Sequence, residues 1–482
     1  MPTPQRGFGQ PGFGPRGPGA GGPDDMRNMI MAIVLSALVF LGYEFTFGAQ
    51  NRERAAQQEK AAAAQQVEAP KPARLLERSE ALAQSPRVKM ENAELDGSIA
   101  LIGARFDDLS LKRYRQKVAK DSPEVSLLNP QGTRGGYDAY LAWGDPYTNE
   151  DIVAARTPWT ADPGPALSPT TPVVLRYATA DGLSFTRTIS IDNQAMFTVT
   201  DTVENTGQTT RALRPFSVVR RRDLPPDFLP NGIIHQGLLG VIGPEQKYRD
   251  ETYQQGQDQA KKKAQGKVVL DAPLVMETGK GGWLGISDHY WLTAVIPPRS
   301  ETIQTRFDAT PKENYIDFRA SYWGGTRKIA PGAKVTYTQQ LFSGAKRVDV
   351  LQTYQKTGIP EFDRAVDWGN FWFLTRPMFM LLDFLGKFAG NFGLGILLTT
   401  VVVKLVLFPL VNTSFESMSK MRKVQPKMKE IQERFASDKE RQQQEMMKLY
   451  QTEKINPVAG CLPIFAQIPV FYALYKTLSV TI

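Results

Sequence analysis

Three segments of this 482-residue chain are apolar over a length that could cross a bilayer. They cover residues 28–47, 391–411 and 460–482. Because a helix needs roughly 20 apolar residues to span the hydrocarbon core, each segment predicts a transmembrane helix. The first segment is longer than the apolar part of a signal peptide and lacks a small-residue cleavage site after it. We therefore expect it to remain as an anchor.

Between the first two apolar segments, residues 88–347 show a period of two. Two runs there alternate with polar residues and put one series of side chains on the same face: Leu183, Phe185, Arg187, Ile189 and Ile191, then Phe197, Val199, Asp201 and Val203. An Asp181-Gly182 turn before the first run predicts a β-hairpin with residues 173–177. Many such short runs separated by Gly and Pro predict a large all-β sandwich. The Gln- and Lys-rich run 254–267 predicts a solvated loop inside it.

The remaining segments have other patterns. Residues 1–27 are rich in Gly and Pro and predict a disordered tail, and residues 48–87 predict a polar linker. Residues 348–390 mix aromatic and charged side chains, which predicts amphipathic helices along a membrane interface. In residues 412–455 apolar side chains recur at steps of three and four, which predicts a helical hairpin. The fold class is therefore a multi-domain membrane protein with α-helical transmembrane segments, a β-sandwich and a hairpin.

Lys404 is the one charged residue of the apolar segment 391–411. An ammonium at this depth costs roughly 2.5–3.5 kcal/mol on insertion scales. Two interpretations stay open. The side chain reaches the nearer membrane surface, or it faces a watery cavity or a partner. Its stem spans only about 6 Å and helical side chains tilt toward the N-terminus, away from that surface, so the cavity is favoured.

Charge and composition narrow the partners and the topology. The formal net charge is +9, which indicates contact with polyanions, and the apolar segments favour anionic lipid over nucleic acid. One cysteine and two histidines, His235 and His289, give no disulfide framework and no zinc spacing, so we expect no metal and no cofactor. Ten Lys and Arg in residues 412–455 predict that the hairpin is cytoplasmic. The β-sandwich would then lie on the outer side, with the N-terminal tail inside.

Several local motifs resemble the YidC membrane protein insertase family, in its Gram-negative form with a large periplasmic domain. In the C-terminal region the matching motifs are Phe408-Pro409-Leu410, Ser417-Met418-Ser419-Lys420-Met421, Gln425-Pro426-Lys427, Gln444-Glu445-Met446-Met447, Tyr450, Lys454-Ile455-Asn456-Pro457, Gly460-Cys461-Leu462-Pro463 and Gln467-Ile468-Pro469. Two upstream runs, Gly103 to Leu111 and Ser122 to Leu128, resemble the family's periplasmic domain. The resemblance extends from the first apolar segment onward.

The resemblance implies an insertase of the bacterial inner membrane, not an enzyme. It implies a hydrophilic groove with one basic residue, at the position of Lys404, where arginine is usual. Candidate groove-lining residues are Thr399, Thr400 and Gln467, and candidate contacts of the cytoplasmic hairpin are Met418, Met421, Met428, Met446 and Met447. Implied partners are nascent membrane-protein clients, the Sec translocon, the ribosome and anionic lipids, without direct contact to nucleic acid. The family has further spanning helices after the third, so the chain resembles a truncated member.

Two other function classes stay open. A sandwich outside the membrane resembles sugar-mutarotase domains, but such an enzyme needs a histidine with carboxylates as acid and base. His235 and His289 have no such pattern beyond Asp288. A transporter would be compatible with an intramembrane lysine, although the sequence lacks an inverted repeat.

Overall fold

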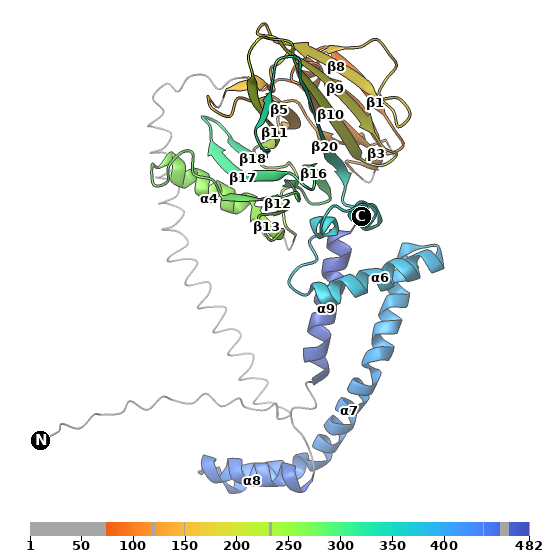
Figure 1. Cartoon of the computed structure of the whole chain (residues 1–482). Helices are drawn as coiled ribbons and strands as arrows, with labels where there is room; N and C mark the ends of the chain where they lie inside the picture. Colours follow the sequence, from red (N-terminus) through yellow and green to blue (C-terminus); the bar gives the residue numbers. More distant parts are fainter. Residues whose placement is uncertain are drawn as a thin grey trace, which may run out of the picture. The chain divides into compact units, whose positions relative to one another are not determined.

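The computed structural model describes residues 74–117, 119, 121–148, 150–230, 234–436, 438–453 and 462–481 (Figure 1). The predicted tail 1–27, the first predicted transmembrane segment 28–47 and most of the predicted linker 48–87 lie outside the described residues, as do position 437 and residues 454–461. All described residues belong to the unit Arg74–Ile482.

Two antiparallel sheets form the region between Arg87 and Ala345, called the β-domain below. They confirm the predicted large all-β domain. The eleven-stranded sheet contains, in spatial order, β1 (Arg87–Glu91), β2 (Leu95–Ala100), β3 (Arg105–Arg115), β5 (Tyr137–Gly144), β11 (Arg211–Arg222), β18 (Ile316–Trp323), β17 (Thr302–Pro311) and β14 (Val275–Lys280), with β4 (Glu124–Leu128), β6 (Asp151–Val153) and β19 (Arg327–Ile329) paired beside this path. The nine-stranded sheet contains β13 (Lys247–Thr252), β12 (Gly237–Ile242), β15 (Trp283–Ser287), β16 (Trp291–Ile296), β20 (Lys334–Ala345), β10 (Met196–Asn205), β9 (Leu183–Ile191), β8 (Val173–Ala178) and β7 (Thr160–Ala161).

The predicted hairpin is the β8–β9 pair. Gly182 adopts φ +93° in the turn, a conformation that suits glycine. Along β9 every second side chain is buried, as the alternation in the sequence predicts. One of these buried side chains is Arg187, which pairs with Asp201 of β10 at 2.7 Å, and Asp201 also accepts a hydrogen bond from Trp143 Nε1. A fully buried ion pair therefore lies inside an otherwise apolar series.

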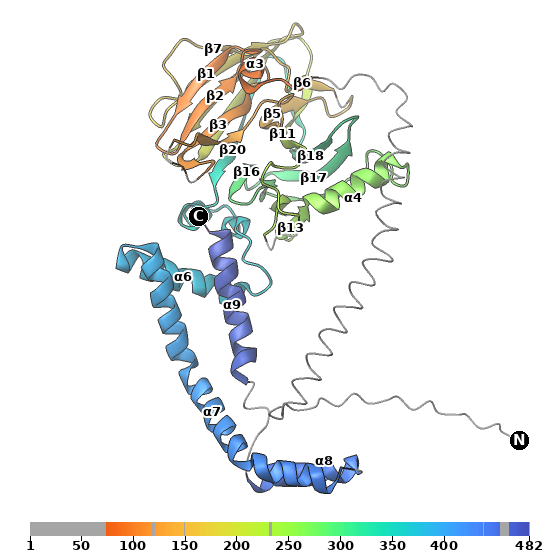
Figure 2. The same cartoon turned by 180° about the vertical axis from the view of Figure 1, so that it is seen from behind.

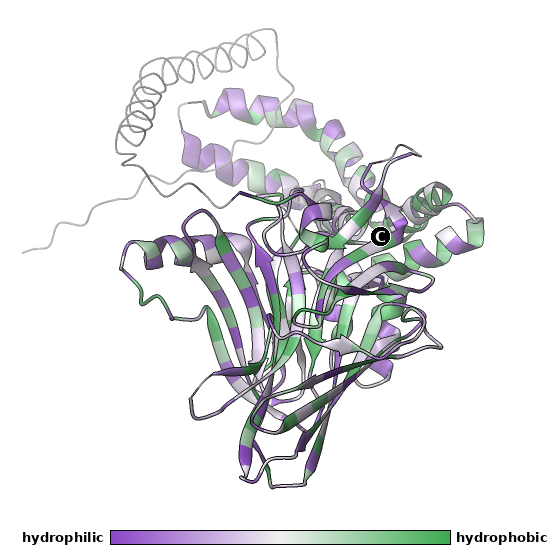
Figure 3. Ribbon diagram, turned by 90° about the horizontal axis from the view of Figure 1, so that it is seen from above, coloured by the Kyte–Doolittle hydropathy of each residue, from purple (hydrophilic) through white to green (hydrophobic). Residues whose placement is uncertain are grey.

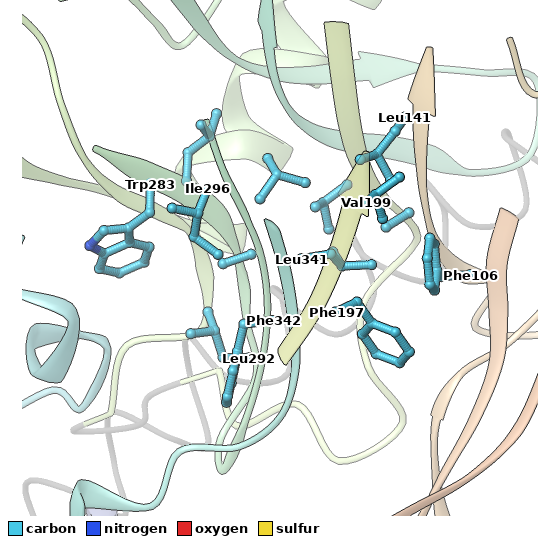
Figure 4. Close-up of a cluster of buried hydrophobic side chains, with 14 of the residues drawn as sticks. Phe106, Leu141, Phe197, Val199, Trp283, Leu292, Ile296, Leu341 and Phe342 are labelled. Atoms are coloured by element: carbon cyan, nitrogen blue, oxygen red, sulfur yellow. The ribbon is translucent and has the colours of Figure 1, made fainter. Parts of the chain in front are cut away.

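The core fills the space between the two sheets and continues on the other face of the nine-stranded sheet, where Phe342 packs against Tyr354 and Phe362 (Figure 4). Phe106 of β3 meets Phe197 of β10 edge to face, with ring centroids 4.9 Å apart. Leu341 and Phe342 of β20 are also fully buried. Hydrophobic and hydrophilic residues alternate along many of these strands in Figure 3. This alternation is the pattern from which the sandwich was predicted.

The run 254–267 was predicted to be a loop, and that prediction is wrong. It forms most of α4 (Tyr253–Ala264), which begins with a capping box in which the Thr252 and Gln255 side chains each accept from the other's backbone N–H. Gly256 lets the helix approach the sheet, since a Cβ there would lie 2.7 Å from the Phe318 ring. Lys263 is buried and donates to the Ala309 carbonyl. The polar composition hid a helix whose packed face consists of Tyr253, Gly256, Ala260 and Lys263.

The other helices are α3 (Arg78–Leu82), α5 (Val348–Lys356), the 3-10 helix η2 (Phe362–Ala365), α6 (Trp372–Ala389), α7 (Phe392–Arg434), α8 (Lys439–Thr452) and α9 (Leu462–Val480) (Figure 2). Residues 348–390 were expected to lie along a membrane interface as a whole. Instead, Leu351 and Phe362 are fully buried in the core of the β-domain. Only α6 of this range presents a broad set of exposed apolar side chains.

Candidate functional site

Helices α6 and α7 cross at close range. Gly390 ends α6 in a left-handed conformation, and Asn391 caps α7 by accepting from the Leu394 N–H at 3.1 Å. Next to this turn, a Cβ on Gly395 would lie 2.6 Å from the Gly386 Cα, so glycine permits the contact. Within the part of the chain that the structure describes, α7 is the one helix long and apolar enough to cross a membrane, by length and composition. Spanning by 460–482 stays a prediction.

A small cavity of about 60 Å³ lies where α6, α7 and α9 meet. It brings together all four residues predicted for the groove: Thr399, Thr400 and Lys404 from α7, and Gln467 from α9. Its other walls are apolar and consist of Met378, Val403, Leu407, Val411, Val470, Phe471 and Leu474. A few polar groups thus converge within an apolar surface, as in many ligand sites.

The polar groups of this cavity differ in their surroundings. Thr399 is fully buried, and its Oγ1 has no hydrogen-bond partner among the described residues. Thr400 is exposed and donates to the Ile396 carbonyl at 2.9 Å. The Lys404 side chain is also exposed. The described residues therefore leave this charge exposed, and the buried cation expected from the sequence stays a prediction.

Helix α8 runs antiparallel to the last turns of α7. Three contacts fix the register: Lys427 with Glu453 at 2.8 Å, Tyr450 Oη with Met428 Sδ at 4.0 Å, and Gln442 with the Gln432 carbonyl at 3.0 Å. The five predicted contact methionines fall into two groups. Met421, Met428 and Met446 are partly covered, whereas Met418 and Met447 are exposed.

The end of α9 is anchored in the β-domain through contacts that sequence reasoning missed. Lys476 is 1% exposed and its Nζ lies 2.6 Å from Asp367 Oδ2. His289 Nε2 donates to the Ser479 carbonyl at 3.1 Å, and Val480 joins the hydrophobic core. The sequence offered one sign of this anchor: Lys476 is a single lysine in the apolar segment 460–482, and Asp367 lies in the aromatic stretch 348–390. Nothing local indicated that they pair.

Asp367 also connects this anchor to a buried histidine. Its Oδ2 accepts from the His235 N–H at 2.8 Å and its Oδ1 from the Gly369 N–H. Burial alone would raise the pKa of Asp367, but Lys476 and these N–H groups outweigh it and hold the pKa below its ordinary value. Burial lowers the pKa of His235, although Asp250 and Asp367 act against it. The anchor is therefore built around an ionised carboxylate and a neutral imidazole.

The acid and base of a sugar enzyme are not assembled from these histidines. His235 Nδ1 lies 3.3 Å from Asp250, but His235 is buried. His289 is hydrogen-bonded to the Ser479 carbonyl, and its ring stacks on Tyr290. Among the described residues no group of three or more His, Cys, Asp or Glu could hold a metal ion.

Comparison with known proteins identifies the family. A membrane protein insertase YidC from Caulobacter vibrioides is 42% identical over 489 residues, which cover 95% of this chain and 77% of that protein. The protein of the same name from Bradyrhizobium diazoefficiens is 38% identical over 497 residues, 95% of this chain and 78% of its own length. The chain belongs to the YidC membrane protein insertase family.

Two family profiles match consecutive parts of the chain, with their boundary inside α6. The YidC periplasmic domain matches residues 87–381, which contain both sheets, and the 60Kd inner membrane protein family matches residues 384–482, which contain α7, α8 and α9. Membership in the YidC family places the chain among inner-membrane insertases and not among enzymes.

Solved structures similar to the chain include a galactose mutarotase-like protein from Lactobacillus casei, with a TM-score of 0.33 and 11% identity over 54% of this chain and 100% of that one. A GH36 alpha-galactosidase from Geobacillus stearothermophilus has a TM-score of 0.32 and 11% identity over 56% of this chain and 42% of its own.

Proposed function

We propose that this chain inserts membrane proteins by admitting a client's polar outer segment to a groove between α6, α7 and α9. The observation that carries the proposal is the cavity that joins Lys404, Thr399, Thr400 and Gln467. Three of these residues were predicted only from their polar character within apolar segments and from the family resemblance. Their convergence in one place supports a common role.

The physical basis is the cost of moving polar groups through hydrocarbon. An amide or hydroxyl without a partner costs about 2–7 kcal/mol on transfer to an apolar medium. Thr399 Oγ1 lacks a partner among the described residues, and the Gln467 amide offers donors and an acceptor beside it. A client segment that hydrogen-bonds to these groups crosses a shorter apolar distance. Its apolar helix then partitions into lipid, so no nucleotide is needed.

Lys404 supplies the charge of this groove. Because its side chain is exposed, it is available to a carboxylate of the client. Lysine presents a compact cation and lacks the planar fork of the arginine usual in the family. Lys404 therefore attracts the carboxylates of acidic clients through its positive charge and does not form a bidentate hydrogen-bonded pair with them.

The remaining parts have roles that follow from charge. The basic hairpin 412–455 faces the cytoplasm, and the β-domain lies in the periplasm, with the N-terminal tail on the cytoplasmic side. The basic residues of the hairpin contact anionic lipid and the ribosome. The exposed Met418 and Met447 contact emerging clients. Insertion proceeds alone or with the Sec translocon as a partner.

Reconstituted insertion tests this proposal. Lys404→Arg should retain insertion of a client with an acidic outer segment, whereas Lys404→Ala should lose most of it, since only the first keeps the charge. The assay follows protease protection of newly synthesised client in proteoliposomes that contain the protein.

Lys429→Ala, an exposed lysine of the same helix outside the cavity, is the matched control. A second client with its outer carboxylates replaced by amides should depend less on Lys404. Equal insertion by the Arg and Ala variants would assign Lys404 to simple contact with the membrane surface and reject the groove.

A further inference from the structure

A second, larger cavity of about 510 Å³ lies away from Lys404. It is bordered by the edge strand β13, by the η2–α6 connection and by the first turns of α6. Its volume falls in the range of about 300–1,000 Å³ that is usual for small-molecule sites. Neither the fold of the β-domain nor the proposed groove requires a cavity here.

This cavity carries both signs of charge. Arg364 lies 2.8 Å from Glu361, and its guanidinium stacks over the Tyr248 ring at 4.5 Å. Both side chains of this pair are about half exposed (47% and 52%), so they can turn toward a ligand. Arg376 pairs with the buried Asp363, and Asp250, 3.3 Å from His235 Nδ1, adds a half-exposed carboxylate. Asp367 also lines the cavity, but its carboxylate is already paired with Lys476. A ligand that matches this arrangement has an anionic and a cationic part.

An unused hydrogen-bond donor belongs to the same wall. Trp368 lines the cavity and is 5% exposed, and its indole Nε1 has no partner among the described residues. Buried indole N–H groups usually find an acceptor. A phosphate oxygen would supply one.

The cavity opens beside the apolar surface of α6. Trp372, which lines it, is 58% exposed, and an exposed stripe continues along the helix through Phe373, Met380, Phe384 and Phe388. These four positions follow helical spacing and lie on one face. Because α6 leads directly into α7, the helix with the length and composition of a membrane span, this stripe is suited to acyl chains at the bilayer surface.

We propose that the cavity binds the headgroup of a phosphoethanolamine phospholipid. Its phosphate contacts Arg364 and Arg376, which hold phosphate oxygens through charge-assisted hydrogen bonds. Its ammonium contacts Glu361 and Asp250, and its acyl chains lie along the α6 stripe. This inference rests on the placement of α6 at the membrane interface and is independent of the insertase mechanism.

Photolabelling of the full chain in nanodiscs tests the site. The discs contain phosphatidylethanolamine and phosphatidylglycerol with a trace of a diazirine-tagged form of one or the other, and mass spectrometry quantifies labelled peptides from residues 361–388. The wild type should label preferentially with the ethanolamine lipid. Arg364→Gln should lower labelling by both lipids about tenfold or more, the loss expected for a charge-assisted pair. Glu361→Gln should abolish the preference and keep labelling by phosphatidylglycerol.

Lys387→Gln is the control, because Lys387 lies on α6 beyond the cavity and pairs with the exposed Asp383. Equal labelling by the two lipids in the wild type, or unchanged labelling in Arg364→Gln, would overturn the proposal. Binding of glycerophosphoethanolamine at millimolar concentration, with no labelling by either lipid, would reassign the cavity to soluble phosphate esters and overturn it as well. Lys404→Ala should leave labelling unchanged, which separates this test from that of insertion.

Discussion

Arg187 and Asp201 form a fully buried ion pair between β9 and β10. The alternation in β9 and β10 placed both Arg187 and Asp201 on the inward face, and the structure agrees. That the two form an ion pair requires the register Asp201↔Arg187 between neighbouring strands. The period of two predicts which way a side chain points, while the identity of its neighbour depends on the turn that sets the register.

At this scale we predict that Asp201→Ala destabilises the β-domain by about 3–5 kcal/mol, since it leaves a buried guanidinium without its counter-charge. The thermal transition followed by circular dichroism should fall by about 10 °C. Asp162→Ala, which breaks an exposed pair with Arg176, is the control and should cost less than about 1 kcal/mol. Similar losses in both variants would mean that Asp201 acts only through packing.

A second prediction concerns pH. Burial lowers the pKa of both histidines of the chain, His235 and His289. The unfolded state, with a pKa near 6.5, then binds more protons below that pH, so stability falls as pH falls from about 6.5 toward the lowered values. The groups that face His235 are Asp250, Asp367 and Lys346, and those that face His289 are Lys346 and Asp227.

The thermal midpoint should therefore drop between pH 7.5 and 5.5, and the double variant His235→Gln/His289→Gln should decline less over this interval. Asp367, whose pKa is lowered, affects stability only at lower pH, below the ordinary range of a carboxyl. An equally steep decline in the double variant would refute the assignment.

At the scale of elements, periodicity predicted most of what the structure contains. Strands with buried alternation and the long apolar helix were found where expected, because a period of two and an unbroken apolar run are strong local signals. α4 was missed because its helical signal is a capping box and a glycine contact, neither of which is hydrophobic. The long helix also continues from Phe392 through Pro409 and Pro426 to Arg434 without the break placed at residue 411. The change from apolar to charged residues after position 411 predicts where the helix leaves the membrane, but the helix itself continues beyond that position.

The element-scale prediction concerns the α7–α8 pair. Met428→Asp should loosen it, since Met428 is partly covered and contacts Tyr450. Amide exchange along α8 should accelerate several-fold, because a charge replaces a partly covered apolar side chain whose full burial would be worth about 1.5–3 kcal/mol. Met447→Asp is the matched control on an exposed methionine. Fast exchange along α8 in the unmodified protein would instead show that the pair is not stable in solution.

For the whole molecule, the sequence predicted the members of the candidate groove but not the anchor of α9. Thr399, Thr400, Lys404 and Gln467 could be chosen because each is polar within an apolar segment. Asp367 and Lys476 are 109 residues apart, and their pairing depends on the docking of α9 against the β-domain. Such a contact has no local pattern, although two opposite charges in apolar surroundings provide a reason to consider it.

We predict a coupling of about 1–3 kcal/mol between Asp367 and Lys476 in a double-mutant cycle. Asp367→Asn, Lys476→Met and the combined variant would be compared by thermal unfolding in detergent, and the combined variant should be more stable than the sum of the single losses implies. Additive losses would show that each residue acts through its other contacts.

The anchoring of α9 also has a consequence for the order in which this protein is made. Val480 completes a core whose strands end at Ala345, so the β-domain cannot reach its final packing when its own last strand leaves the ribosome. At about 5–20 residues per second, synthesis of the intervening chain takes about 7 to 27 seconds. During that time the β-domain is already translated but lacks the contact with α9. Its final packing should therefore follow the placement of α6, α7 and α8.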